Sequence, residues 1–279
     1  MLIFKERASL TAYLLTLRTE GKTIGFVPTM GALHEGHLSL LETAHGAADQ
    51  VVCSIFVNPT QFNDPEDFKK YPVDTDEDIR RLLVAPVNVL FLPAVNEIYD
   101  QGTGALARYP FGRLESLLEG AYRPGHFQGV GQVMGRLLGI IPADYLFMGQ
   151  KDYQQTLIVN ELIGLLNIKT KLVTCPTLRE ADGLAMSSRN VRLSPEARGK
   201  APFLYKTLLF VRDHLEQMPL EALIVRATAQ LEQEGFRVDY LVIADKTLTP
   251  LTEPAAAPMI CLVAAWLEGV RLIDNLLLS

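Results

Sequence analysis

Short apolar runs alternate with longer amphipathic segments along the first two-thirds of the chain. The apolar runs have the length of buried strands, and the amphipathic segments carry apolar residues at helical spacing. The predicted strands cover residues 22–28, 51–57, 87–93, 144–149 and 169–176. The predicted helices cover residues 37–48, 76–85, 131–141 and 153–167. This alternation predicts βαβ units that build a doubly wound α/β domain around five parallel strands.

The pattern changes after Pro176. Two helical stretches, 195–217 and 219–234, are followed by extended runs at 238–244 and 257–267. The predicted core of this part combines a helical stripe with one aromatic residue: Leu204, Leu208, Val211, Leu215 and Trp266. We therefore predict two domains, an α/β domain over residues 1–177 and a smaller α+β domain over residues 178–279.

Charge and composition exclude several classes of function. The formal net charge is -6 and Lys and Arg form no long run, so a broad surface for nucleic acid or anionic membrane is not expected. Lys5, Glu6 and Arg7 interrupt the region where a signal peptide needs its apolar core, and no apolar run approaches membrane-spanning length. A cytoplasmic protein is therefore expected. The three cysteines lie far apart without a CxxC pair, which favours reduced, structural thiols.

The segment PTMGALHEGH, residues 28–37, follows the first predicted strand and contains His34 and His37. A zinc site would need a third ligand, and no Cys or Glu is arranged with the two histidines. A phosphate site fits the chemistry better, because Gly31 and Gly36 permit close backbone approach and a helix N-terminus carries unpaired N–H groups. From this segment alone, a strand-to-helix turn with incidental histidines remains an open alternative.

Three other segments strengthen the phosphate interpretation. Lys151 in GQKDYQQ follows another predicted strand, so parallel pairing puts it at the same edge of the sheet. MSSRN, residues 186–190, offers two hydroxyls and Arg189 near the predicted domain boundary, where ligand clefts are favoured. Asn58 and Gln61 end a third strand with groups suited to hydroxyl and carboxylate recognition. Each segment alone is also explained as a cap, a solvated charge or a turn, but together they predict a shared nucleotide site.

Three further features have two interpretations each. The Gly- and Pro-interrupted segment 118–130 carries Arg123 and His126, and it is either a substrate-covering loop that supplies a cation or a surface excursion. Glu35 is either a base or a solvated carboxylate at a helix start, and the second interpretation is favoured. Met30 packs either against a ligand or in the core.

Five motifs resemble, in order and approximate spacing, those of the pantothenate synthetase family, the pantoate–β-alanine ligases of the nucleotidylyltransferase superfamily. The motifs are VPTMGALHEGHLSL, SIFVNPTQF, YRPGHFQGV, GQKDYQQ and DGLAMSSRN, and the resemblance covers essentially the whole chain. It implies a Rossmann-like N-terminal domain, a smaller C-terminal domain and a homodimer. It also implies that ATP and pantoate form pantoyl adenylate and pyrophosphate, and that β-alanine then displaces AMP to give pantothenate.

The resemblance also implies roles for individual residues. His34 and His37 would contact ATP phosphates, with His37 as the proton donor, and Lys151 and Arg189 would complete the catalytic set. The other expected ATP contacts are Met30, Gly31, Ala32, Leu33, Glu35, Gly36, Gly149, Gln150, Asp152, Leu178, Met186, Ser187 and Ser188. The expected contacts to pantoate and β-alanine are Gln61 and Gln155 from the resemblance, and Asn58, Arg123 and His126 from the sequence pattern. Mg²⁺ would be held largely by ATP oxygens, with no protein metal site.

Two positions depart from the family pattern. The usual GEKD is here GQKD, so Gln150 loses a charge, and the frequent YPRT is here YPVD, so Val73 stands where arginine is common. Activity is still expected, because the histidines, Lys151 and Arg189 remain. Two alternatives stay open: a nucleotidyl transferase whose product keeps the adenylate, and a nucleotide-binding module without catalysis. A tRNA synthetase is disfavoured by the acidic balance and the lack of an extended basic RNA-binding domain.

Overall fold

The computed structural model describes residues 1–104, 106–255 and 258–278. The predicted run 257–267 starts at a residue outside this set, and its remaining residues are described. Within the described residues, no helix combines the length and the apolar character that crossing a membrane requires. The three cysteines are buried and free, and burial raises the pKa of the Cys53 thiol to about 12, which suits the predicted structural role.

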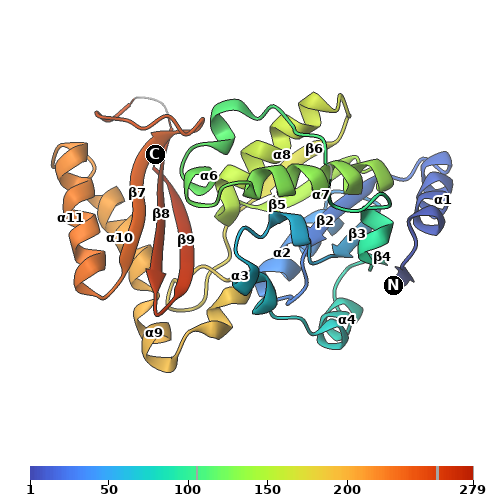
Figure 1. Ribbon diagram of the computed structural model, residues 1–279, viewed down its shortest axis with the longest axis horizontal. Helices are drawn as coiled ribbons and strands as arrows, with labels where there is room; N and C mark the ends of the chain where they lie inside the picture. Colours follow the sequence, from blue (N-terminus) through green and yellow to red (C-terminus); the bar gives the residue numbers. More distant parts are fainter. Residues whose placement is uncertain (105, 256–257, 279) are drawn as a thin grey trace. The chain divides into compact units, whose positions relative to one another are not determined.

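The contacts of the chain divide it into two compact units (Figure 1). The first unit consists of Met1–Gly149 and Gln154–Pro176. The second unit consists of Gln150–Tyr153 and the described residues from Thr177 onward. These units differ from the predicted domains in residues 150–153, whose contacts lie with the second unit. The predicted boundary between independently folding domains stays a prediction.

The first unit is built on a six-stranded sheet in which every neighbouring pair of strands is parallel. The strands are β1 (Leu2–Phe4), β2 (Ile24–Thr29), β3 (Gln50–Ile55), β4 (Val89–Phe91), β5 (Tyr145–Gly149) and β6 (Lys171–Cys175). The predicted doubly wound α/β fold is confirmed. The predicted count of five strands is wrong by one, because β1 has only three residues and pairs with β4 at the edge of the sheet. A strand that short carries too little hydrophobic pattern to be found in the sequence.

The order of the strands in this sheet is β1-β4-β3-β2-β5-β6. The chain proceeds from β2 to β3 and β4 on one side, and then returns to β5 and β6 on the other side of β2. The winding direction therefore reverses at β2. In open α/β sheets, ligands bind beyond the carboxyl ends of the strands at this reversal. The histidine motif follows the carboxyl end of β2 directly.

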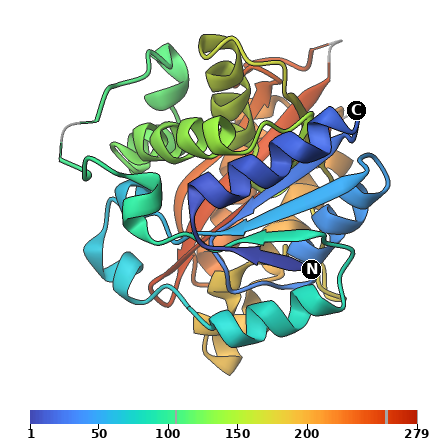
Figure 2. The ribbon, with the colours of Figure 1, turned by 90° about the vertical axis from the view of Figure 1, so that its right-hand side faces the viewer.

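Helices cover both faces of the sheet, as Figure 2 shows for α1 and α7 on one side and α4 on the other. The helices in this part of the chain are α1 (Arg7–Thr19), α2 (Glu35–His45), α3 (Pro65–Lys69), α4 (Thr75–Leu83), α5 (Val95–Ile98), α6 (Glu119–Tyr122), α7 (His126–Ile140) and α8 (Tyr153–Leu165). Phe26 and Val52 pack with buried residues of α1, α7 and α8, whereas the adjacent Val27 and Cys53 pack with α2 and α4. The strands are apolar on both faces because each face supports its own core.

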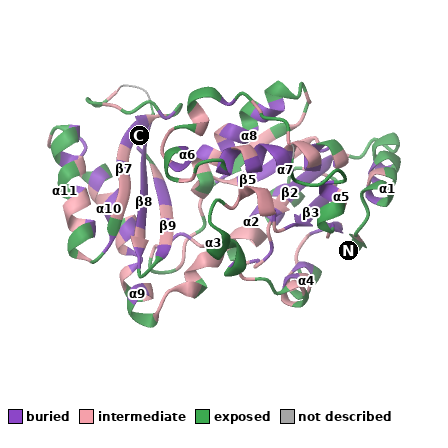
Figure 3. Ribbon diagram, in the orientation of Figure 1, coloured by how far each residue is buried: buried purple, intermediate pink, exposed green. Residues whose placement is uncertain are grey.

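The second unit contains a three-stranded antiparallel sheet, with the strand order β7-β8-β9. Its elements are β7 (Arg237–Asp245), β8 (Met259–Leu267), β9 (Val270–Leu278), α9 (Pro195–Lys200), α10 (Phe203–Asp213) and α11 (Leu220–Gln233). The predicted stripe Leu204, Leu208, Val211 and Leu215 is buried in the core of this unit. Figure 3 shows buried residues along β8. The predicted smaller α+β part is confirmed.

The prediction that Trp266 belongs to this core is wrong. Successive strand residues point to opposite faces, and Val263, Ala265 and Leu267 of β8 supply the core side chains. Trp266 is only half-buried, and its Nε1–H donates to the two carboxylate oxygens of Asp239 at 3.1 and 3.0 Å. The indole nitrogen of a half-buried tryptophan needs such a partner.

One glycine on α7 lets this helix touch the turn that carries Gln61. A Cβ atom built on Gly129 would lie 2.2 Å from the carbonyl oxygen of Thr60, in the 3-10 turn η1 (Pro59–Gln61). Asn58 Nδ2 also donates to the Gly129 carbonyl oxygen at 3.1 Å. The close approach of helix and turn therefore has no room for a side chain.

We predict that Gly129→Ala destabilises the first unit, because the added methyl group must displace the η1 backbone. The free energy of unfolding should fall by about 1–3 kcal/mol, as for other overpacked sites. Gly139→Ala is the matched control, since Gly139 lies on the same helix and a Cβ there meets no atom within 4 Å. This control should gain about 0.5–1 kcal/mol from helix propensity. Urea denaturation of both variants measures the difference, and equal midpoints would contradict the close approach.

Candidate functional site

The turn between β2 and α2 depends on two successive residues with left-handed backbone. Gly31 has a φ of 81° and Ala32 a φ of 49°. A side chain at Gly31 is excluded twice, by this conformation and because a Cβ would lie 2.8 Å from Asp78 Oδ2. The turn ends at His34, which precedes the first residue of α2 in an extended conformation. The sequence therefore folds here as a tight strand-to-helix turn that presents the histidines at a helix N-terminus.

The carboxylate of Asp78 on α4 binds the backbone of this turn. Its Oδ2 accepts a hydrogen bond from the Ala32 N–H at 2.9 Å, and its Oδ1 accepts one from the Leu33 N–H at 2.7 Å. Asp78 is 2% exposed, and burial raises the pKa of its carboxyl group although both hydrogen bonds oppose the rise. Ala32 and Leu33 were predicted as ATP contacts, and their backbone donors are paired within the protein.

Sequence reasoning missed Asp78 because it lies in a helix full of charges. The carboxylate of Asp74 caps α4 by accepting from the Glu77 N–H at 2.9 Å, and acidic residues fill the first turn of the helix. One signal was present: Asp78 stands four residues before the buried Leu82, on the apolar face of α4. A carboxylate on such a face needs partners from another part of the chain.

The rings of His34 and His37 lie against each other at the start of α2, in a tilted arrangement. Their ring centroids are 4.0 Å apart and their planes are inclined by 34°. The His34 N–H donates to His37 Nδ1 at 3.3 Å, and the His37 N–H donates to the His34 carbonyl oxygen at 2.7 Å. Because Nδ1 of His37 accepts a hydrogen bond, the proton of the neutral ring is on Nε2. Backbone groups of the motif therefore help to orient the His37 ring.

Two other properties of the motif bear on its chemistry. Among the described residues, no group of three or more His, Cys, Asp or Glu is arranged to hold a metal ion. Glu35 is exposed, and its Oε1 lies 3.9 Å from Arg81 Nη1. Its position matches the interpretation as a solvated carboxylate at a helix start, where an acid is favourable.

Asn58 and Gln61 form a linked pair beyond the end of β3. Asn58 Nδ2 donates to Gln61 Oε1 at 3.2 Å, and Asn58 Oδ1 accepts from the Tyr99 hydroxyl at 2.7 Å. Gln61 Nε2 lies 2.8 Å from Met30 Sδ, so the segments that follow β2 and β3 meet here. Asn58 is 1% exposed. Its amide is used inside the protein, so it positions Gln61, and Tyr99 is a supporting residue that the sequence did not reveal.

Arg123 and His126 converge on the same glutamine. His126 Nδ1 donates to the Gln61 carbonyl oxygen at 2.8 Å, and His126 Nε2 accepts from Arg123 Nη1 at 3.1 Å. These two bonds require the neutral ring with its proton on Nδ1. Glu119 Oε2 lies 3.9 Å from Arg123 Nη1 and offsets its charge. His126 is therefore turned toward the backbone of Gln61.

Gln155 lies half-buried in the first turn of α8. Its neighbour Gln154 is buried and ties this turn to the segment before α6. Gln154 Oε1 accepts from the Glu119 N–H at 3.0 Å, and Gln154 Nε2 donates to the carbonyl oxygens of Leu114 and Leu117 at 2.8 and 2.9 Å. The start of α8 is thus fixed by one glutamine, and Gln155 is the next residue along the helix.

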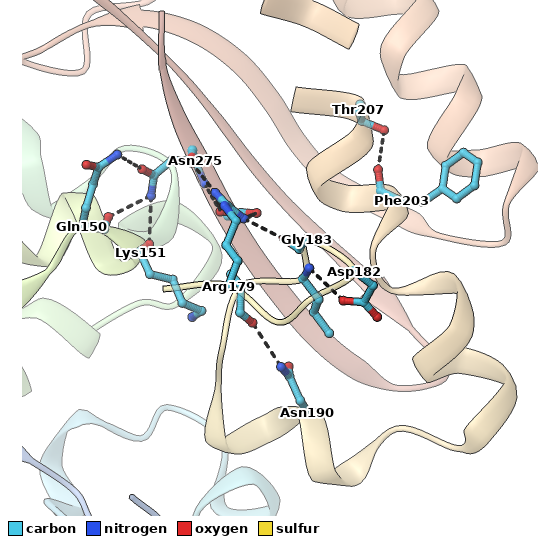
Figure 4. Close-up of polar contacts among 12 residues, drawn as sticks. Gln150, Lys151, Arg179, Asp182, Gly183, Asn190, Phe203, Thr207 and Asn275 are labelled. Carbon is cyan, nitrogen blue, oxygen red and sulfur yellow. Dashed lines mark hydrogen bonds and ion pairs between the residues drawn. The ribbon is translucent and has the colours of Figure 1, made fainter. Parts of the chain in front are cut away.

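Lys151 lies in the 3-10 turn η3 (Gln150–Asp152), which follows β5 and belongs to the second unit. Its side chain is 19% exposed, and its Nζ lies 3.9 Å from Asp152 Oδ1. Asn275 of β9 contacts the backbone of this turn, as Figure 4 shows. Gln150, which departs from the family pattern, donates from Nε2 to Asn275 Oδ1 at 3.1 Å. An ionised carboxylate at this position has no proton to donate.

The segment from Leu178 to Arg189 forms a small hairpin followed by a 3-10 turn. Arg179 and Ala185 make an antiparallel bridge, and the Met186 N–H donates to the Leu178 carbonyl oxygen at 3.1 Å. Ser187 Oγ accepts from the Arg189 N–H at 3.3 Å and so caps the turn η4 (Ser188–Arg192). Ser187 therefore caps this turn, and its predicted contact with ATP stays a prediction.

The structure thus divides the predicted site residues between the two units. In the first unit are Met30, Gly31, Ala32, Leu33, His34, Glu35, Gly36, His37, Asn58, Gln61, Arg123, His126, Gly149 and Gln155. In the second unit are Gln150, Lys151, Asp152, Leu178, Met186, Ser187, Ser188 and Arg189. Val73, the other departure from the family pattern, is 66% exposed. Asp78, Tyr99 and Asn275 are supporting residues that sequence reasoning missed.

Known proteins are similar to this chain over its whole length. The model of the family described as pantoate-beta-alanine ligase matches residues 2–277. The pantothenate synthetase of Moorella thermoacetica is 42% identical over 283 aligned positions, which cover 100% of this chain and 99% of that protein. The crystal structure of pantothenate synthetase from Thermus thermophilus matches with a TM-score of 0.91 and 43% identity, covering 99% of both chains.

A third relative was solved with ligands. The pantoate-beta-alanine ligase from Francisella tularensis, complexed with beta-gamma ATP and beta-alanine, matches with a TM-score of 0.85 and 36% identity over 99% of this chain and 97% of that one. The matches extend over both units, as the resemblance of the five motifs predicts. The chain therefore belongs to the pantoate–β-alanine ligase family, whose members condense pantoate with β-alanine in an ATP-dependent reaction.

Proposed function

We propose that this ligase activates pantoate at His34, His37, Lys151 and Arg189, which contact the phosphates of ATP. The observation that carries the proposal is the pair of adjacent histidine rings, with centroids 4.0 Å apart, at a helix N-terminus beyond the strand where the winding of the sheet reverses. Polyphosphates bind at such helix N-termini because backbone N–H groups and the helix dipole favour negative charge.

The reaction consists of two displacements. In the first, a carboxylate oxygen of pantoate attacks the α-phosphorus of ATP, the bond to the bridging oxygen breaks, and pyrophosphate leaves. In the second, the free amine of β-alanine attacks the acyl carbon, AMP leaves, and the amine loses a proton as the amide forms. The mixed anhydride already carries the activation, so no cysteine or serine nucleophile is needed.

The first displacement brings together two anions, so positioning and charge neutralisation dominate its catalysis. Lys151 and Arg189 supply fixed positive charge, and the histidines supply hydrogen-bond donors whose orientation the backbone sets. His37 is suited to donate from Nε2, because its Nδ1 accepts the His34 N–H. We assign His37 as the proton donor on this basis.

Gln61 and Gln155 are proposed to hold pantoate, with β-alanine entering beside Gln61. The support is the environment of Gln61, whose side chain and backbone are fixed by Asn58, Met30 and His126. A preorganised neutral amide recognises a hydroxyl or carboxylate without adding charge to the site. Arg123 and Asn58 act through these contacts as positioning residues.

Mg²⁺ is proposed to arrive with ATP as part of the substrate. Phosphate oxygens are its preferred partners, and the described residues contain no cluster of three protein ligands for a resident metal. A homodimer in the cytoplasm is proposed on the resemblance to the family. Light scattering in solution should then give twice the chain mass of 30.9 kDa.

We predict that ATP, Mg²⁺, pantoate and β-alanine together yield pantothenate and AMP in equal amounts. Without β-alanine, pyrophosphate and enzyme-bound pantoyl adenylate should form in a single turnover without free AMP. Following all products by chromatography separates the alternatives. Pyrophosphate with no AMP in the complete mixture would instead identify a nucleotidyl transferase. ATP binding without pyrophosphate would identify a binding module.

We predict that Lys151→Ala slows adenylation by roughly a hundred- to thousandfold, because one preorganised charge on the phosphates is lost. Single-turnover pyrophosphate release measures this step. Lys200→Ala is the control, since Lys200 pairs with Glu196 one helical turn away on an exposed surface. Pyrophosphate release by Lys151→Ala at the rate of this control would remove Lys151 from the catalytic set.

We predict that Asp78→Ala weakens both the fold and ATP binding, because the Ala32 and Leu33 N–H groups lose their acceptors. Unpaired buried donors cost about 1–3 kcal/mol each, so the loss of two acceptors should lower the free energy of unfolding by roughly 2–6 kcal/mol. Asp78→Asn keeps the volume and one acceptor oxygen, so its loss should be smaller. Glu77→Ala, next in sequence but exposed, should change either quantity little. Calorimetric ATP binding equal to wild type in Asp78→Ala would show that the clamp is not required.

A further inference from the structure

We propose that Asn275, a buried residue of β9, is a positioning residue that holds Lys151 for its contact with ATP. The proposal rests on the phosphate-binding role proposed above for Lys151. Asn275 is 2% exposed and lies 124 positions from Lys151 in the sequence, and both belong to the second unit.

The side chain of Asn275 makes three hydrogen bonds to the η3 turn (Figure 4). Its Nδ2 donates to the carbonyl oxygens of Gln150 and Lys151 at 2.9 and 3.0 Å. Its Oδ1 accepts from Gln150 Nε2 at 3.1 Å. Two bonds to consecutive carbonyl groups fix the backbone from which the Lys151 side chain extends.

The side chain at position 150 is matched to this clamp. Both Nδ2 protons of Asn275 are directed to backbone carbonyls. Its Oδ1 has no proton and needs a donor as its partner. Gln150 supplies the donor that this oxygen needs. Gln150 therefore forms the third hydrogen bond of the clamp. Relative to the carboxylate of the family pattern, it lacks the charge and has an N–H donor instead.

The preceding residue of β9 holds the other ATP segment of the same unit. Asp274 accepts from Arg179 Nη1 at 2.6 Å and from Arg179 Nη2 at 3.0 Å, and the guanidinium lies 3.6 Å from the centroid of the Tyr205 ring. Arg179 starts the hairpin that leads to Ser187 and Arg189. Burial raises the pKa of Asp274, and the charges of Arg179 and Lys151 oppose that rise.

Two adjacent strand residues therefore set the position of Lys151 relative to the hairpin. This geometry explains why a polar Asp-Asn pair occurs inside the apolar strand VRLIDNLLL. An amide buried there without a partner would be unfavourable, and its partners are the backbone atoms of the lysine turn. The role of Asn275 is thus to position the lysine, because both of its side-chain N–H donors bind backbone carbonyls of the protein.

The test is a double-mutant cycle on Asn275→Ala and Lys151→Ala, read by single-turnover pyrophosphate release with ATP, Mg²⁺ and pantoate. Asn275→Ala should slow this release by about ten- to hundredfold, as expected for a misplaced catalytic group. In steady-state assays of the complete reaction, the KM for β-alanine should stay unchanged. In the Lys151→Ala background the same substitution should have no further effect, because the group it positions is already gone.

Thr207→Val is the matched control for the loss of a buried hydrogen bond in this unit. Thr207 is buried, and its Oγ1 bonds to the Phe203 carbonyl oxygen at 2.9 Å within α10 (Figure 4). This variant should keep wild-type kinetics. Gln150→Met removes only the third bond of the clamp and should lower kcat/KM for ATP about two- to tenfold. It provides the measurement if Asn275→Ala does not fold.

The outcomes separate the two proposals. A large loss in Lys151→Ala together with wild-type kinetics in Asn275→Ala and Gln150→Met overturns the positioning role and leaves the function of Lys151 intact. Wild-type kinetics in Lys151→Ala overturn the assignment of Lys151, and the positioning proposal falls with it. If the two rate losses multiply in the double variant, Asn275 acts independently of Lys151, and this result also overturns the proposal.

Discussion

The histidine motif depends on the hydrogen bonds between the backbone of the β2–α2 turn and the buried carboxylate of Asp78. Gly31 and Ala32 both have left-handed backbone, a conformation that an L-residue such as Ala32 adopts only when its surroundings enforce it. Asp78 enforces it by taking the N–H groups of Ala32 and Leu33. Burial disfavours the charge on Asp78, and the two hydrogen bonds offset part of that cost. The positions of His34 and His37 follow from this balance.

The carboxylate of Asp78 also changes what the β2–α2 turn can offer to a polyphosphate. Asp78 occupies two backbone donors that the sequence had assigned to ATP, so the loop offers less positive charge than its glycine pattern indicates. The proposed function therefore depends on charged side chains, and Lys151 and Arg189 are the ones proposed for that role. Buried amides provide the same kind of support elsewhere. Asn58 orients Gln61, and Asn275 bonds to the turn of Lys151, each through bonds that are internal to the protein.

The sequence was sufficient for the parts of the structure that depend on local pattern. Four-to-eight-residue apolar runs gave the strands β2 to β6, and the residues after β2, β3 and β5 were correctly expected at strand ends. The supporting partners could not be found in this way, because they join distant positions. Asp78 meets Leu33 across 45 positions and Asn275 meets Lys151 across 124. Only its position four residues before Leu82, on the apolar face, distinguishes Asp78 from the other acids of α4. Trp266 was misplaced because strand register, not hydrophobicity, decides which face it joins.

The division of the chain at η3 has a mechanical consequence. The backbone passes from the first unit to the second after Gly149, returns after Tyr153, and passes again after Pro176. Three covalent linkages therefore connect the units, where two consecutive domains would share one. Two of these linkages are only four residues apart along the chain. Lys151 lies between those two linkages, so the residue proposed to hold the phosphates belongs to a short segment of the second unit that is joined to the first unit at both ends.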